Sequence, residues 1–174
     1  MLIEDGWKGQ PGLKVLCGGE AFPPDLAEAL FPRVGSVWNM YGPTETTIWS
    51  SLQQLKPGEV ISIGHPIHNT QLYVLNDALE PVPQGCAGML YIGGDGVATG
   101  YYRRSDLTQA AFVPDPFSSQ PGARIYRTGD LARLFAARVG PTGVVVHTDI
   151  NGAMLAEGRD KLIDRGIALP TVQC

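Results

Sequence analysis

Residues 39–47 read N-M-Y-G-P-T-E-T-T, and they follow an apolar-aromatic run, residues 36–38, that is typical of the end of a strand. The stretch brings an aromatic ring, a Gly-Pro turn, several hydroxyls and one carboxylate together within a few positions. A ring can offer an apolar face to a base, a hydroxyl can reach a phosphate oxygen, and a carboxylate can hold a magnesium ion. The stretch therefore predicts a nucleoside triphosphate site, presented by the Gly-Pro turn.

The residues before this stretch indicate a strand, a helix and a second strand. Leu13–Cys17 is a short apolar strand, a Pro-Pro pair opens a helix over Asp25–Phe31, and Val34–Trp38 forms the next strand. Functional loops follow strand ends in a parallel α/β layer, so we expect residues 39–47 at the carboxyl edge of such a layer. Residues 1–58 are assigned to this layer, and the fold class is α/β.

After about Pro57 the hydrophobic period changes to that of antiparallel strands. Strands are expected at Thr70–Leu75 and Gly88–Gly93, separated by turns. One helix, N-capped by Ser105, interrupts them. Residues 59–133 are therefore expected to form a small, mainly antiparallel β subdomain.

The bulk composition excludes several classes of protein. The chain has 174 residues, of which 44% are hydrophobic and 17% charged, as in a globular domain. The net charge of -4 argues against a nucleic-acid partner, which clustered Lys and Arg would bind. No apolar run approaches the length of a membrane span, and the start carries no signal segment, so no membrane association is expected. Three widely spaced cysteines predict no disulfide framework and a cytoplasmic location.

Two further motifs are interpreted as structural. Gly93–Gly100, G-G-D-G-V-A-T-G, lacks the Gly-Lys-Ser/Thr of a P-loop, so its glycines are expected to serve close packing and a sharp strand exit. Tyr101 and Tyr102, which follow it, are expected to be partly buried structural residues. His65 and His68 have a proline between them, which disfavours the helical spacing that a shared metal ion would need.

Asp130 belongs to the motif Y-R-T-G-D-L at residues 126–131. A carboxylate after a glycine turn can accept hydrogen bonds from two adjacent hydroxyls, as a ribose presents them. On its own such a motif is more often a turn than a ligand site, so its meaning depends on the motifs around it.

Five motifs, taken in order, carry a family resemblance. They are L-C-G-G-E-A, N-M-Y-G-P-T-E-T-T, I-S-I-G-H-P-I-H-N-T, G-M-L-Y-I-G-G-D-G-V-A-T-G-Y and Y-R-T-G-D-L. Over residues 13–133 the chain resembles the adenylate-forming superfamily, and most closely the adenylation domains of nonribosomal peptide synthetases. The resemblance implies a reaction that joins an amino acid to ATP with Mg²⁺, giving an acyl-adenylate and pyrophosphate. It also implies a partner, a peptidyl-carrier domain whose phosphopantetheine thiol receives the acyl group.

The resemblance also implies roles for individual residues. Tyr41 corresponds to the residue that stacks on adenine, and Asp130 to the ribose clamp. Thr44 corresponds to the phosphate contact and Glu45 to the magnesium ligand, and these two are the expected catalytic residues. The other residues expected beside the nucleotide are Gly18, Gly19, Asn39 and Gly42.

The same correspondence predicts which side chains select the amino acid. The predicted lining consists of Leu16, Gly18, Met40, Ile48 and Trp49. Trp49 is bulky and Leu16 and Met40 are apolar, so little room remains for a substrate side chain. The set L-G-M-I-W is similar to that of glycine-activating domains, so glycine or another small amino acid is the predicted substrate. The alternative is that Trp49 is a core residue that points away from the site.

The match covers only part of such a domain. A Ser/Thr/Gly-rich phosphate loop with its Lys, the aspartate that holds the substrate amine, and the Lys of the C-terminal domain have no counterparts. Residues 158–166 echo the hinge motif of the family with different spacing, so Arg159 is only a candidate ribose contact. Residues 134–174 are interpreted as a divergent tail, consistent with a frameshifted or truncated gene. The isolated chain is therefore expected to be a poor catalyst.

Two other functions stay open at this stage. Tyr-Gly-x-Thr-Glu and Thr-Gly-Asp also recur in acyl-CoA synthetases, although Y-G-P-T-E-T-T followed by I-G-H-P-I favours the peptide synthetase. The other alternative is a degenerate module that binds nucleotide weakly and catalyses nothing.

Overall fold

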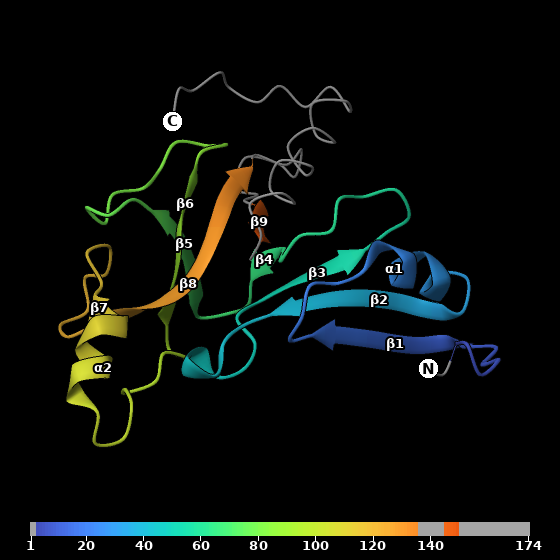
Figure 1. Ribbon diagram of the computed structural model, residues 1–174, viewed down its shortest axis with the longest axis horizontal. Coiled ribbons are helices and arrows are strands. Elements are labelled where there is room, and N and C mark those ends of the chain that lie inside the picture. The colour runs from blue at the N-terminus through green and yellow to red at the C-terminus, as the bar shows by residue number, and fades with distance from the viewer. Residues whose placement is uncertain (1–2, 136–144, 150–174) are drawn as a thin grey trace.

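The computed structural model describes residues 3–135 and 145–149, which form two β-sheets placed one after the other along the long axis (Figure 1). The first sheet has the strand order β1 (Gln10–Gly18), β2 (Val34–Tyr41), β3 (Ser51–Leu55), β4 (His65–Pro66). The second sheet has the order β5 (Thr70–Leu75), β6 (Ala87–Gly94), β8 (Arg124–Phe135), β7 (Phe112–Pro114), and β9 (Val145–Asp149) pairs with β8. The helical segments are α1 (Pro24–Leu30), the 3-10 helix η1 (Thr44–Thr46) and α2 (Ser105–Ala111).

The first sheet contains one parallel strand pair. β1 and β2 run parallel, whereas β3 runs antiparallel to β2 and β4 antiparallel to β3. The connection between β2 and β3 is a tight turn over residues 42–50, and so short a connection permits only antiparallel pairing. The expected strand-helix-strand order is present, but the structure does not confirm a parallel α/β layer.

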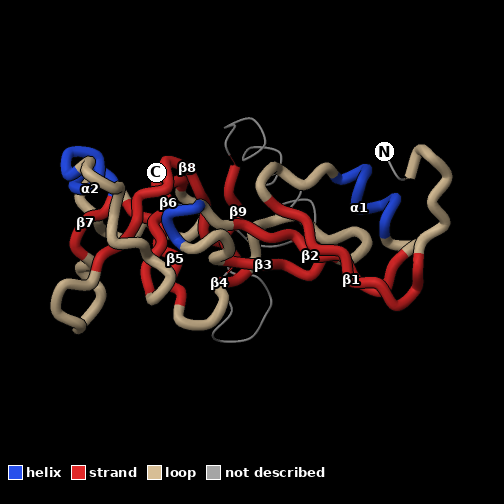
Figure 2. Tube along the Cα trace, turned by 90° about the horizontal axis from the view of Figure 1, so that it is seen from below, coloured by secondary structure: helices blue, strands red, loops and turns tan. Residues whose placement is uncertain are grey.

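Helix α1 lies on one face of the first sheet (Figure 2). Pro24 occupies its first turn, where the missing N–H costs nothing, and Arg33 N–H donates to Leu30 O after the helix ends. Leu30 packs with Val37 of β2 and Leu55 of β3 in one buried cluster, which also holds Phe22 and Ala27. Burying one such aliphatic side chain stabilises the fold by about 1.5–3 kcal/mol.

The second sheet is antiparallel throughout the described residues. Its core holds Leu75, Leu90, Ile92 and Ile125, all fully buried. This agrees with the β character expected for residues 59–133. Since β4 pairs with the first sheet, the two sheets divide between Pro66 and Thr70, and the domain limits at 58/59 and 133/134 stay predictions.

The structure corrects three smaller expectations. Ser105 is the first residue of α2 and not its N-cap, which is Arg104 without a side-chain capping bond. Tyr102 is 83% exposed, so it is not a partly buried residue. Cys17 is a free thiol, but Cys86 is disulfide-bonded, a bond that the sequence analysis did not anticipate.

Part of the predicted tail belongs to the second sheet. β9 pairs antiparallel with the end of β8, with Val146 opposite Leu134. The candidate ribose contact Arg159 lies outside the described residues. Among the helices that are described, none has the length and apolar character to cross a membrane.

Candidate functional site

Residues 39–47 lie where the two sheets meet, at the end of β2 and in the turn that leads to β3 (Figure 1). The chain reverses so tightly here that Ser50 N–H donates to Tyr41 O at 2.8 Å. A Cβ on Gly42 would lie 2.5 Å from Ile48 O and 2.6 Å from Ser50 N, so only glycine fits at this position. The buried hydroxyls of Thr46 and Ser50, 2.6 Å apart, close the turn from inside. These two hydrogen bonds and the close approach at Gly42 fix the position of η1 within the turn.

Tyr41 and Asp130 meet across the two sheets, although they are far apart in the chain. The Tyr41 hydroxyl donates a hydrogen bond to Asp130 Oδ2. Burial, the hydrogen bond to Asp130 and the negative charge of Asp130 together raise the pKa of Tyr41, which keeps its phenol protonated. Asp130 N–H donates to Thr128 Oγ1 at 3.0 Å, and Thr128 Oγ1 donates to Leu90 O at 2.9 Å. The predicted base-stacking residue therefore touches the predicted ribose clamp.

Glu45 of η1 is held by a tyrosine from the connection between β6 and α2. The Tyr101 hydroxyl donates to Glu45 Oε1 at 2.6 Å. Burial acts to raise the pKa of Glu45, but hydrogen bonds from Tyr101, its own backbone N–H and Tyr126 outweigh burial and bring the pKa below its usual value. Glu45 is therefore an ionised acceptor at neutral pH. The residue pattern alone predicts only a structural role for Tyr101, and its place in the T-G-Y end of the fourth motif is the one signal in the sequence that points to the site.

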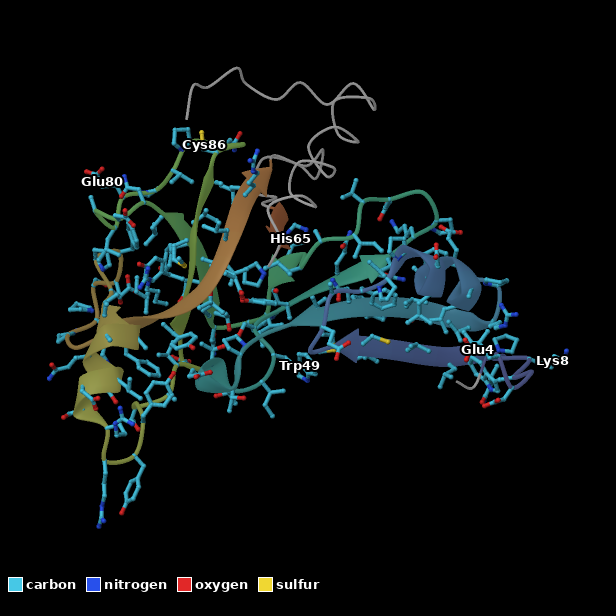
Figure 3. The ribbon with its side chains drawn as sticks, in the orientation of Figure 1. Glu4, Lys8, Trp49, His65, Glu80 and Cys86 are labelled. Carbon is cyan, nitrogen blue, oxygen red and sulfur yellow. The ribbon has the colours of Figure 1, made fainter. Side chains whose placement is uncertain are left out.

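Three of the five predicted selectivity residues contact one another. Gly18 and Met40 are paired across β1 and β2, and a Cβ on Gly18 would lie 2.5 Å from Met40 O and 2.6 Å from Trp49 Cη2. The Trp49 ring therefore lies against Gly18, at the carboxyl end of β1 (Figure 3). Leu16 and Ile48 are each 58% exposed, so in the described chain they do not enclose a pocket.

Trp49 is presented by a backbone conformation that sequence reasoning missed. Thr47 and Ile48 have φ angles of 64° and 72°, in the left-handed region that β-branched residues avoid. Trp49 N–H donates to Thr47 O at 2.9 Å, which closes a γ-turn centred on Ile48. Such conformations cost about 1–3 kcal/mol each and persist only where the surroundings impose them. Nothing in the residue types of this turn signals the strain.

Three further residues predicted beside the nucleotide, Asn39, Gly19 and Thr44, make none of the contacts described above. Asn39 is buried, and its amide donates to Ser62 O at 2.7 Å, which is a structural contact. Gly19 has a φ of 91° and open space around its Cα, and Thr44 is exposed at the start of η1. A polar hollow of about 590 Å³ in the second sheet, lined by Tyr73 and Arg124 among others, includes none of the predicted site residues.

The described residues contain no cluster of three or more His, Cys, Asp or Glu side chains that could cage a metal ion. A single carboxylate such as Glu45 suits Mg²⁺, which protein sites commonly bind through one or two carboxylates together with substrate phosphates and water. The donors present thus fit magnesium held jointly with a triphosphate.

Comparison with known proteins places these features in a family. The family model described as AMP-binding enzyme matches residues 4–102. The chain is 40% identical over 195 residues to the PKS-NRPS hybrid synthetase ATPKS of Aspergillus niger, covering 99% of this chain and 10% of the relative. It is 56% identical over 124 residues to a dimodular nonribosomal peptide synthase of Bacillus subtilis, covering 70% of this chain and 5% of the relative.

A solved structure resembles the fold as well as the sequence. The holo form of AB3403, a four-domain nonribosomal peptide synthetase bound to AMP and glycine, aligns with a TM-score of 0.73 and 47% identity. The alignment covers 84% of this chain and 11% of that structure. The chain therefore spans about a tenth or less of the length of these relatives.

Proposed function

Because this chain belongs to the AMP-binding enzyme family, as part of an adenylation domain of the nonribosomal peptide synthetase type, we propose that it forms one wall of an amino-acid-activating site. In the proposed reaction a carboxylate oxygen of the amino acid attacks the α-phosphorus of ATP, and pyrophosphate leaves with the electrons of the broken P–O bond. The acyl group then passes to the phosphopantetheine thiol of a carrier domain, and AMP leaves. The hydrogen bond between Tyr41 and Asp130 is the observation that carries the proposal.

That hydrogen bond puts two nucleoside-binding groups side by side. The Tyr41 ring supplies a face for adenine, and Asp130 supplies two acceptor oxygens for the vicinal hydroxyls of ribose. Because the partly buried Tyr41 phenol stays protonated, it donates to one oxygen of Asp130 and leaves acceptor capacity on that carboxyl group for ribose. Base and ribose of one nucleoside have the same adjacency, which supports a nucleotide at this junction.

Thr44 and Glu45 extend the wall toward the phosphates. Thr44 is exposed at the start of η1, where its hydroxyl is free to meet a phosphate oxygen. Glu45 would hold Mg²⁺ together with the triphosphate, and the metal would supply neutralising charge for the leaving pyrophosphate. The residues of the chain itself bind and orient; in-line positioning of this kind is the main requirement of phosphoryl chemistry.

Glycine is the amino acid that we propose for this site. The Trp49 ring rests on the Cα of Gly18 and leaves little space above β1 for a substrate side chain. AB3403, which aligns with the chain, is a synthetase bound to AMP and glycine. Relatives of the peptide synthetase type favour this function over an acyl-CoA synthetase.

Calorimetric titration of the chain with ATP and MgCl₂ tests the nucleotide site. The Asp130→Asn variant should bind ATP about 10- to 100-fold more weakly, because it loses charge-assisted hydrogen bonds to ribose. Asp77→Asn, an exposed turn position in the second sheet, is the matched control and should bind as the wild type. Equal affinity of the Asp130 variant and the wild type would contradict the assignment of the ribose clamp.

Pyrophosphate exchange by the full-length parent protein with single amino acids tests the substrate and the reaction. Glycine should support the fastest exchange, and phenylalanine should support none. Exchange with phenylalanine but not glycine would overturn the substrate assignment. ATP binding without exchange for any amino acid would favour the third function, a nucleotide-binding module without catalysis.

A further inference from the structure

We propose that Tyr101 is a positioning residue for the Glu45 carboxylate and thereby sets the affinity of the site for a divalent cation. The inference rests on the proposed function, in which Glu45 is the cation ligand. The carrying observation is the 2.6 Å hydrogen bond from the Tyr101 hydroxyl to Glu45 Oε1, which joins residues 56 positions apart. A carboxylate can accept about four hydrogen bonds or ligands. Engaging part of this capacity fixes the group and leaves the rest for a cation.

The Tyr101 hydroxyl is placed by an aromatic cluster in the second sheet. The Tyr101 ring meets Phe112 edge-on with ring centroids 5.5 Å apart, and Phe112 in turn contacts Tyr126 at 5.1 Å. Phe112 and Tyr126 are 4% and 7% exposed, so they form a buried base for the Tyr101 ring. Tyr126 also lies near enough to Glu45 to help lower the pKa of that carboxylate. One hydrogen-bonded phenol and a second phenol from the same packed cluster are therefore near one carboxylate.

The backbone on both sides of this contact is fastened as well. Ala98 N–H donates to Glu45 O at 2.8 Å, and Thr47 Oγ1 donates to Gly96 O at 2.7 Å. Residues 94–101 and the η1 segment are thus held together by two hydrogen bonds that do not involve the carboxylate. Removing the Tyr101 hydroxyl should free the Glu45 side chain without releasing η1.

The end of the 94–101 loop is equally well defined. Tyr101 N–H donates to Thr108 Oγ1 at 2.9 Å. Gly100 has a φ of 133°, and a Cβ there would lie 2.7 Å from Thr108 Oγ1. Arg124 Nη2 donates to Thr99 O at 2.9 Å. These contacts fix the 94–101 loop against α2 and β8. The fourth sequence motif therefore forms a well-packed connection between β6 and α2, not a phosphate loop.

Tyr101 therefore acts on the site by orienting the Glu45 carboxylate. Groups that hydrogen-bond to metal ligands commonly have this role, and removing such a group lowers metal affinity by about 10- to 100-fold. The neighbouring Tyr102 has the same residue type but is 83% exposed. It therefore provides a matched control.

The experiment measures Mn²⁺ binding to the full chain by electron paramagnetic resonance, with and without saturating ATP. Tyr101→Phe should raise the Mn²⁺ dissociation constant about 10-fold or more, while its metal-free ATP affinity stays unchanged. Its thermal midpoint should fall only slightly, because the hydrogen bonds from Ala98 N–H and Thr47 Oγ1 still hold the two segments together. Tyr102→Phe should match the wild type, and Glu45→Gln should lose most Mn²⁺ binding. A purely structural Tyr101 would instead change the thermal midpoint and leave Mn²⁺ affinity alone. Tyr126→Phe removes the second phenol and serves as an independent variant if Tyr101→Phe unfolds.

The outcomes separate this inference from the proposed function. Weakened Mn²⁺ binding in Glu45→Gln but not in Tyr101→Phe or Tyr126→Phe would overturn the positioning role alone. Unchanged binding in Glu45→Gln, or no Mn²⁺ binding by the ATP-bound wild type, would overturn both the positioning role and the metal role of Glu45. Loss of ATP binding by Asp130→Asn would still support the nucleotide site in either case.

Discussion

Replacing Gly18 with alanine tests how closely the first sheet and the Trp49 ring are packed. The added Cβ would lie 2.5 Å from Met40 O and 2.6 Å from Trp49 Cη2. Ordinary contacts begin at 3.4 Å, so the carbonyl oxygen of the paired strand would have to move by about 0.9 Å. Unlike the end of a flexible side chain, this oxygen belongs to the backbone of β2, which is paired with strands on both sides and cannot shift at one atom alone.

The expected cost follows from this overlap. Overpacking of this kind destabilises a fold by about 1–3 kcal/mol, and we expect Gly18→Ala to lie in that range. Gly12→Ala is the matched control, because Gly12 lies in the same strand and its Cβ would meet nothing within 4 Å. The control should stay within about 0.5 kcal/mol of the wild type.

Urea unfolding followed by tryptophan fluorescence gives both free energies of unfolding. The double variant Gly18→Ala/Trp49→Ala should recover part of the loss, because it removes the ring but not the Met40 oxygen. A Gly18→Ala variant as stable as Gly12→Ala would refute the close packing of Trp49 on β1. That result would also remove the steric reason for proposing a small amino acid as the substrate.

Three further predictions concern single side chains. Tyr41→Phe removes the bond to Asp130 and should destabilise the chain by about 1.5–3 kcal/mol in urea unfolding; an unchanged midpoint would contradict the link between the sheets. Burial raises the pKa of Tyr41, so unfolding releases phenolic protons at alkaline pH, and stability should fall as pH rises above the ordinary tyrosine value of about 10. The fall in stability at alkaline pH should be smaller in Tyr41→Phe, and an equal fall in both proteins would show that Tyr41 is not its source. Burial also raises the pKa of Cys17, so iodoacetamide at pH 8 should alkylate the folded chain more slowly than the urea-unfolded chain, as mass spectrometry can show.

Local patterns predicted the first elements of the fold well. Apolar runs and proline positions predicted β1, α1 and β2 in the correct order, because burial and helix-start chemistry are local properties. They did not reveal β3, S-L-Q-Q-L, since its polar residues carry no strand signal. Gln53 is instead fixed by distant partners: its side chain donates to Val60 O and accepts from Ser62 N–H. The direction of β3 follows from the tight 42–50 turn.

Motif order and spacing propose the members of the candidate site, but not the contacts between them. Order and spacing of motifs brought Tyr41, Glu45 and Asp130 into one hypothesis. No sequence rule distinguishes Tyr101, which contacts Glu45, from its exposed neighbour Tyr102. The left-handed backbone at Ile48 contradicts local preference and is imposed by the folded surroundings.

The junction between the two sheets also has a thermodynamic consequence. The bond from Tyr41 to Asp130 joins the two sheets, and the bond from Tyr101 to Glu45 joins the segments that follow β2 and β6, so a separation of the sheets would break both together. A ligand that stabilises the state with one of these bonds formed therefore also stabilises the other bond. Thermodynamic linkage requires the effect of each ligand on the affinity for the other to be equal. A nucleoside at Asp130 and a cation at Glu45 would thus raise each other's affinity by one common factor, without any direct contact between them.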